Sequence, residues 1–160
     1  MLTQARDAAA LTDVILLIFK LNGQLLAAGD RLVVHLRLTS ARWQLLGAVA
    51  LSRSPSTAPQ LAAVMGVTRQ GAQKQLDLLL EAALVTALPN PGHARSPLYV
   101  LTRKGTAVFA ATERVQRAWA MKLSDSISAS DLQAAKRLLA AMGERLTEAA
   151  RPLKPSRRVR

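Results

Sequence analysis

The sequence contains no cysteine, which excludes disulfide bonds, thiol nucleophiles and cysteine-ligated zinc sites. Aromatic residues are also scarce, with two Trp, two Phe and one Tyr. An aromatic platform that stacks single-stranded bases is therefore not expected. The two histidines, His35 and His93, lack metal-ligand spacing. We expect neither a metal site nor a cofactor, and we expect His93 to be exposed and His35 to be structural.

Catalytic motifs are missing as well. No Ser-His-Asp order stands out, and the chain has neither a G-x-S-x-G elbow nor a phosphate-binding P-loop. The sequence therefore predicts a protein that is not an enzyme.

Acidic residues are few, with 10 Asp and Glu against 22 Lys and Arg, so the net charge is +12. Residues 1–150 alone carry +7. A basic body of this kind favours DNA, RNA or an anionic membrane surface as partner. The alternative is a basic protein that has no polyanionic partner.

Long apolar runs are absent too. The longest uninterrupted run, Val14 to Phe19, is far shorter than the ~20 residues that a membrane-spanning helix needs. Asp7 and Asp13 precede it and no convincing cleavage site follows, so it is a poor signal-peptide core. We interpret the run as the buried face of an amphipathic helix and expect a cytoplasmic protein without a membrane partner.

The most informative pattern lies in residues 57–82, which predict two short helices joined by a tight turn. Thr57 and Gln60 form a capping-box pair, and Gly66 suits the left-handed end of the first helix. Thr68 caps the second helix. Its apolar face comprises Ala72, Leu76, Leu79 and Leu80, and its polar face comprises Arg69, Gln70, Gln73 and Lys74. This is a helix-turn-helix pattern, in which the second helix reads a DNA major groove.

Other elements flank this motif. A helix is predicted over 5–28, followed by a weakening at Gly29-Asp30 and an ambiguous segment to Leu38. A second helix follows a cap at Thr39 or Ser40 and runs to about residue 51, and 52–56 form a loop. Further on, the pattern predicts strands at 84–88 and 98–101, a long helix from Thr102 to about 123 that is lightly broken at Gly105, and a last helix at 131–150 capped by Ser128 or Ser130.

The predicted fold class is therefore mainly α with a small β-wing: a winged helix-turn-helix flanked by terminal helices. We expect one domain over 1–150, with a DNA-binding core at 39–102 and dimerisation helices at 5–38 and 103–150. Residues 151–160 form a basic tail that we expect to be disordered, and which touches DNA phosphates outside the specific site or merely aids solubility.

Both terminal regions carry apolar stripes. They comprise Leu11, Val14, Ile15, Ile18, Leu21, Leu25 and Leu26 at one end, and Leu132, Ala135, Leu138, Leu139, Met142 and Leu146 at the other. The stripes either pack together within one chain or join two copies. We favour the homodimer, because helix-turn-helix proteins pair symmetric dimers with palindromic sites.

Three segments resemble the MarR family of transcriptional regulators. They are LTSARWQLL at 38–46, QLAAVMGVTRQGAQKQLDLLLEAALV at 60–85 and LYVLTRKG at 98–105. The order of the predicted elements is also similar. The resemblance implies a repressor more often than an activator. It also implies a small aromatic effector, which would be bordered here by Trp43 and Trp119, although core packing is the more ordinary role of both.

The wing departs from the pattern frequent in this family, Asp-Pro-x-Asp-Arg-Arg. The matching stretch, 90–95, carries Asn90 and His93 in place of the acids and keeps only the second arginine, as Arg95. An ion pair that braces the wing is therefore not expected. The residues predicted to contact double-stranded DNA are Thr57, Thr68, Arg69, Gln70, Gln73, Lys74, His93, Arg95 and Ser96.

A second interpretation of the same pattern remains open. A winged helix also serves as a protein-interaction module, whose basic face meets acidic partners or binds nucleic acid without sequence preference. Selection of a DNA sequence and a steep salt dependence distinguish the two.

Overall fold

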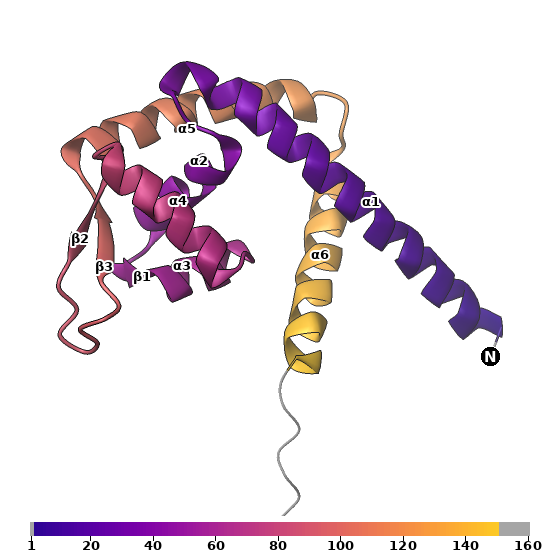
Figure 1. Cartoon of the computed structure of the whole chain (residues 1–160). Coiled ribbons are helices and arrows are strands. Elements are labelled where there is room, and N and C mark those ends of the chain that lie inside the picture. Colours follow the sequence, from indigo (N-terminus) through magenta and orange to yellow (C-terminus); the bar gives the residue numbers. More distant parts are fainter. Residues whose placement is uncertain (1, 151–160) are drawn as a thin grey trace, which may run out of the picture. The chain divides into compact units, whose positions relative to one another are not determined.

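The computed structural model describes residues 2–150, so the predicted disorder of the tail at 151–160 concerns a segment outside the described residues. The chain is divided into two compact units, with the boundary between Arg117 and Ala118. The elements are α1 (Leu2–Val33), η1 (a 3-10 helix, Val34–Leu36), α2 (Ser40–Leu51), β1 (Ser56–Thr57), α3 (Ala58–Met65), α4 (Arg69–Glu81), β2 (Val85–Leu88), β3 (Leu98–Leu101), α5 (Arg103–Ser124) and α6 (Ala129–Ala149) (Figure 1). The mainly helical class with a small β-wing is confirmed.

The winged helix lies in the first unit. There α2, α3 and α4 pack together beside an antiparallel sheet of strand order β1-β3-β2 (Figure 1). The predicted hairpin of β2 and β3 forms, and Tyr99 on the central strand pairs with Ala87 on β2 and Ser56 on β1. Ser56 was predicted to lie in a loop, and this prediction is wrong. This two-residue strand exists because β3 supplies its hydrogen-bond partner, which no local pattern reveals.

One apolar core holds the winged helix together. Its largest fully buried apolar side chains are Val33, Leu46, Leu61, Leu76, Leu79 and Val85. The predicted apolar face of α4 is therefore the face that packs inward, and Arg69, Gln70 and Lys74 are left exposed on the other face.

The predicted helix caps of the motif are present. The hydroxyl oxygen of Thr68 accepts the N–H of Gly71 at 3.0 Å. The side-chain oxygen of Gln60 accepts the N–H of Thr57 at 2.8 Å. Gly66 ends α3 at φ 64°, in the left-handed region. The Thr68 bond fixes where α4 begins, and the other two features define the start and the end of α3.

The weakening predicted at Gly29-Asp30 is wrong, since α1 continues to Val33. Gly29 is buried, and a Cβ placed on it would lie 2.6 Å from the Ser40 hydroxyl oxygen. The Asp30 carboxylate accepts the N–H of Ser40, also at 2.6 Å. Both residues thus serve the packing of α1 against the start of α2, and this tertiary contact outweighs the low helix propensity of glycine.

The light break predicted at Gly105 is also wrong, since α5 runs through it without interruption. The Thr102 hydroxyl accepts the N–H of Gly105 at 2.9 Å and donates to the carbonyl of Ala83 at 2.7 Å. The Lys104 amine donates to the carbonyl of Ala82 at 2.8 Å. The start of α5 is therefore tied to the chain that leaves α4, and glycine is needed there for a close approach.

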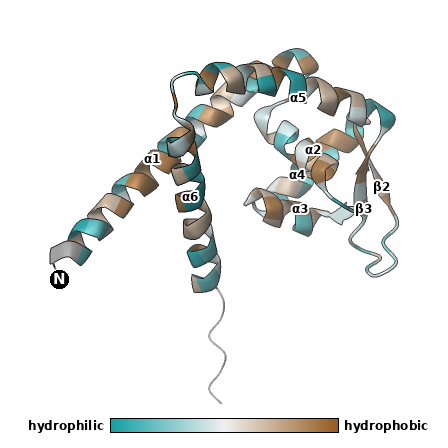
Figure 2. Cartoon of the chain, turned by 180° about the vertical axis from the view of Figure 1, so that it is seen from behind, coloured by the Kyte–Doolittle hydropathy of each residue, from teal (hydrophilic) through white to brown (hydrophobic). Residues whose placement is uncertain are grey.

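Most side chains of the two apolar stripes are exposed, and the burial predicted for the run from Val14 to Phe19 stays a prediction. On α1, the stripe residues Leu11 and Leu21 are 45% and 52% exposed, and on α6 the stripe residue Leu146 is 69% exposed. Figure 2 shows the apolar residues distributed along α1 and along α6. Amphipathicity predicts that a face is buried but not in which chain its partner lies.

The first helix also has the length and composition of a membrane span. The stretch Gln4–Leu36 reaches a mean hydropathy of 1.5. A search for uninterrupted runs overlooks it, because polar residues divide the run. Length and composition do not distinguish such a helix from a core helix of a soluble protein or from a signal sequence.

Candidate nucleic-acid interface

A groove of about 810 Å³ lies between the starts of α3 and α4 and the wing, defined as the β2–β3 hairpin with its loop at 89–97. We call it the basic groove. Its lining consists of Thr57, Ala58, Pro59, Arg69, Gln70, Gln73, Asn90, His93, Arg95, Ser96 and Pro97. Seven of the nine residues predicted to contact DNA are therefore brought together. Of the other two, Lys74 lines a shallower hollow further along α4, and Thr68 caps that helix.

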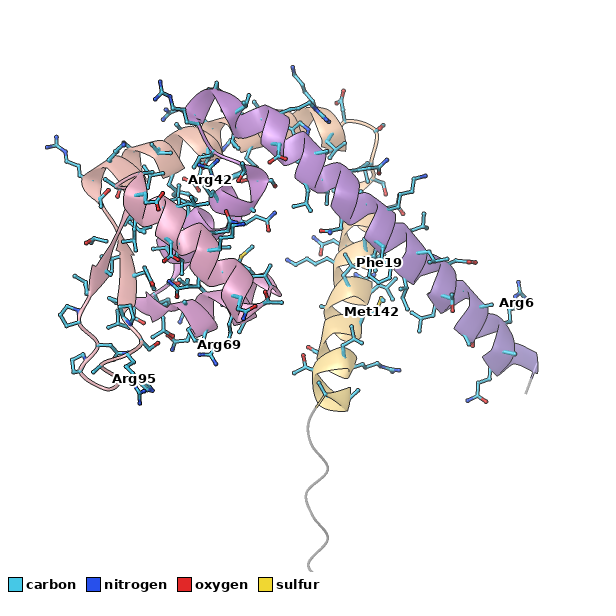
Figure 3. All side chains as sticks on the ribbon, viewed as in Figure 1. Arg6, Phe19, Arg42, Arg69, Arg95 and Met142 are labelled. Atoms are coloured by element: carbon cyan, nitrogen blue, oxygen red, sulfur yellow. The ribbon has the colours of Figure 1, made fainter. Side chains whose placement is uncertain are left out.

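The basic groove has the electrostatics of an anion-binding surface. Its lining carries two guanidinium groups and one imidazole but no carboxylate. The N-terminal ends of α3 and α4 both contribute to it, and the positive end of a helix dipole favours negative charge. Figure 3 shows Arg69 on α4 and Arg95 on the wing at the same edge of the winged helix. The surface thus offers both charge for phosphates and side-chain donors for base edges.

Asn90 braces the wing in place of an ion pair. Its side-chain nitrogen donates to the carbonyl of Ser96 at 2.8 Å, and its side-chain oxygen accepts the N–H of Gly92 at 3.1 Å. Its backbone carbonyl accepts the N–H of His93 at 3.1 Å. The pattern at 90–95 shows that an acid is missing, but this role of Asn90 was not predicted. The available signal was Asn-Pro-Gly, because asparagine side chains bond their own backbone in turns.

We expect Asn90→Asp to weaken DNA binding roughly tenfold, because aspartate cannot donate to the Ser96 carbonyl and adds negative charge to the basic groove. Affinity for a duplex, measured by fluorescence anisotropy, checks this. Asn22→Asp is the matched control, since it adds the same charge at an exposed position on α1. Equal affinities of the two variants would show that the side-chain hydrogen bonds of Asn90 do not contribute to DNA binding.

Gln73 and Tyr99 form a further contact that sequence reasoning missed. The side-chain nitrogen of Gln73 donates to Asp77 at 2.8 Å and to the Tyr99 hydroxyl at 3.0 Å. Tyr99 is 3% exposed. No local signal pairs residues 26 positions apart, although a buried tyrosine commonly finds a hydrogen-bond partner.

The two tryptophans occupy different units. Trp43 on α2 is half-buried and packs against the core, with a ring carbon 3.6 Å from a Cβ placed on Gly29. Trp119 on α5 is also half-buried, but it belongs to the second unit. His35, expected to be structural, is exposed in the middle of η1. The ligand role of each tryptophan stays a prediction.

A family model and a relative both match this chain. The model of the MarR family matches residues 38–96. The uncharacterized protein Rv2011c of Mycobacterium tuberculosis is 37% identical over 119 residues, which cover 74% of this chain and 82% of that protein.

Solved structures extend the likeness over more of the chain. The MarR family transcription regulator SP03579 has a TM-score of 0.75 and 26% identity, covering 91% of this chain and 96% of that chain. A mutant of MarR from E. coli, complexed with operator DNA, has a TM-score of 0.73 and 22% identity, covering 83% and 95%; at this identity the likeness concerns the fold alone. From the matched model, the relative and the shared fold, we conclude that this chain belongs to the MarR family.

Proposed function

We propose that this protein is a transcription regulator that binds double-stranded DNA with sequence specificity. The observation that carries the proposal is the basic groove, in which side chains of α4 and of the wing converge without any carboxylate in the lining. The net charge of +12 supports the same class of partner. The E. coli MarR mutant complexed with operator DNA shares the fold.

The docking follows from the geometry of helix-turn-helix proteins, in which the second helix enters the major groove. In this proposal α4 is that helix and the wing lies at the flanking minor groove. Arg69 suits guanine, whose O6 and N7 a guanidinium grips, and the glutamines Gln70 and Gln73 suit adenine. Phosphate contacts come from Thr57, Thr68, Lys74, His93, Arg95 and Ser96.

The active form in this proposal is a homodimer. The exposed apolar side chains of α1 and α6 need a partner surface, and a second copy supplies one. The proposed dimerisation regions are 5–38 and 103–150. Two copies of α4 then read a pseudo-palindrome whose half-sites lie about one helical turn apart.

The proposal extends to regulation by a small molecule. A repressor bound at its operator blocks transcription, and a small aromatic effector that prefers the non-binding spacing of the two copies of α4 releases it by population shift. Trp43 and Trp119 are the proposed effector contacts. The protein acts in the cytoplasm, without a membrane partner.

The test is selection from random duplexes. We expect enrichment of a palindrome, and an affinity that falls linearly with salt concentration on logarithmic axes, because bound phosphates release counterions. The mass in solution at micromolar concentration should be that of a dimer. Failure to enrich any sequence at moderate salt would favour a protein-interaction module or nonspecific binding. A monomeric mass would exclude the dimer.

A further inference from the structure

Two glutamines on α4 line the basic groove, but they differ in their surroundings. Gln73 is half-buried, and its side-chain nitrogen donates to Asp77 at 2.8 Å and to Tyr99 at 3.0 Å. Gln70 is exposed, and within residues 2–150 no side-chain hydrogen bond is found for it. The same side chain thus occurs once in a network and once facing solvent.

The network determines the orientation of the Gln73 amide. A carboxylate accepts hydrogen bonds and donates none, so the amide nitrogen and not the oxygen must face Asp77. That nitrogen has two hydrogens, and Asp77 and Tyr99 use both. Reading adenine requires the nitrogen and the oxygen of one amide together. In this arrangement only the oxygen of Gln73 remains for a base.

The other end of the network lies in the sheet. Tyr99 is 3% exposed and sits on β3, the central strand, which follows the wing loop directly. Its hydroxyl is therefore held by a ring packed in the core. The bond from Gln73 to Tyr99 joins the DNA-facing side of α4 to the strand that carries the wing. It is a direct side-chain bond between the helix and the wing.

We propose that Gln73 is a positioning residue, held by Tyr99 and Asp77, and that Gln70 is the glutamine of α4 that reads a base. This inference rests on the proposed function and reverses the equal roles predicted for the two glutamines. Loss of the network shifts α4 against the wing and weakens binding to every sequence alike. Loss of Gln70 changes which base is preferred.

Gln70→Met and Gln73→Met form a matched pair, because methionine keeps the length and the high helix propensity of glutamine. We expect Gln70→Met to alter base preference at one position of the selected site. We expect Gln73→Met to lower affinity about three- to tenfold, as for the loss of a hydrogen bond, with the base-preference profile unchanged. Tyr99→Phe, which removes only the hydroxyl, should give the same profile and a similar loss.

A double-mutant cycle completes the test. Tyr99→Phe and Gln73→Met both remove the bond between these two side chains. The double variant should therefore lose no more affinity than the single variant that shows the larger loss. Thermal unfolding and circular dichroism confirm that each variant is folded before its affinity is measured. If Tyr99→Phe does not fold, the preference profile of Gln73→Met still decides.

The outcomes separate the two proposals. A changed base preference in Gln73→Met, or additive losses in the cycle, overturns the positioning role while the proposed function stands. A wild-type protein that selects no sequence overturns the proposed function itself.

Discussion

Gly105→Ala is expected to lower the free energy of unfolding by about 3 kcal/mol or more in total. This loss is at or above the upper end of the usual cost of overpacking. A Cβ at this position would overlap the carbonyl oxygen of Leu84 and lie 2.8 Å from its carbonyl carbon. That carbonyl also accepts the N–H of Thr102 at 3.1 Å and its hydroxyl at 3.3 Å. It cannot move away without losing these bonds, so the strain falls on the backbone. Denaturant unfolding followed by circular dichroism measures the effect.

Gly143→Ala is the matched control for Gly105→Ala. Gly143 is also inside a helix, but a Cβ there would meet nothing within 4 Å. Alanine has the higher helix propensity by about 1 kcal/mol, so this variant should be at least as stable as the wild type. If both glycines tolerated alanine equally, the close approach of α5 to Leu84 would not matter for stability.

The second large effect is expected on DNA recognition. Arg69→Ala should remove about 1–3 kcal/mol of discrimination at one base pair, since a bidentate arginine–guanine contact contributes about that much. Arg69 is the first residue of α4 and is exposed in the basic groove. Dissociation constants for the selected duplex, and for the same duplex with single base changes, measure the discrimination.

Arg95→Ala tests the contribution of the wing to DNA binding. Arg95 is exposed on the loop rather than on α4, so its loss should weaken binding evenly across sequences and reduce the salt slope by about one. Arg145→Ala removes the same charge from an exposed position on α6 and controls for the net charge. Equal and small effects of the Arg69 and Arg95 variants would contradict the contact assignment.

The helix-turn-helix was predictable because its signals are local. The caps at Thr68 and Gly66 act within three or four residues of themselves, and the spacing of Leu76 and Leu79 follows the helical period. The strands of the wing were predictable for a similar reason, since turn-forming residues separate two short apolar runs. Where bonding and burial follow from neighbours in sequence, pattern and structure agree.

The failures have the opposite cause. Glycine at 29 and at 105 predicted weakness, yet each permits a close approach to Ser40 or to Leu84, which lie 11 and 21 residues away. In the sequence, Gln73 has the pattern of any polar residue on an exposed helix face. Only the fold brings the Tyr99 hydroxyl within hydrogen-bond distance of it. A propensity scale assigns one value to each residue and holds no record of distant contacts.

The sequence by itself determined the class of fold, the approximate limits of α4 and the family, because periodicity, caps and turn residues act over a few positions. Only the tertiary structure decided that the basic groove gathers Arg69 and Arg95, that Asn90 replaces an ion pair, and that Gln73 is held by the sheet. Those properties depend on hydrogen bonds and packing between segments far apart in the chain. Such contacts form only when the helices pack on the shared apolar core, to which Leu46 and Leu79 belong.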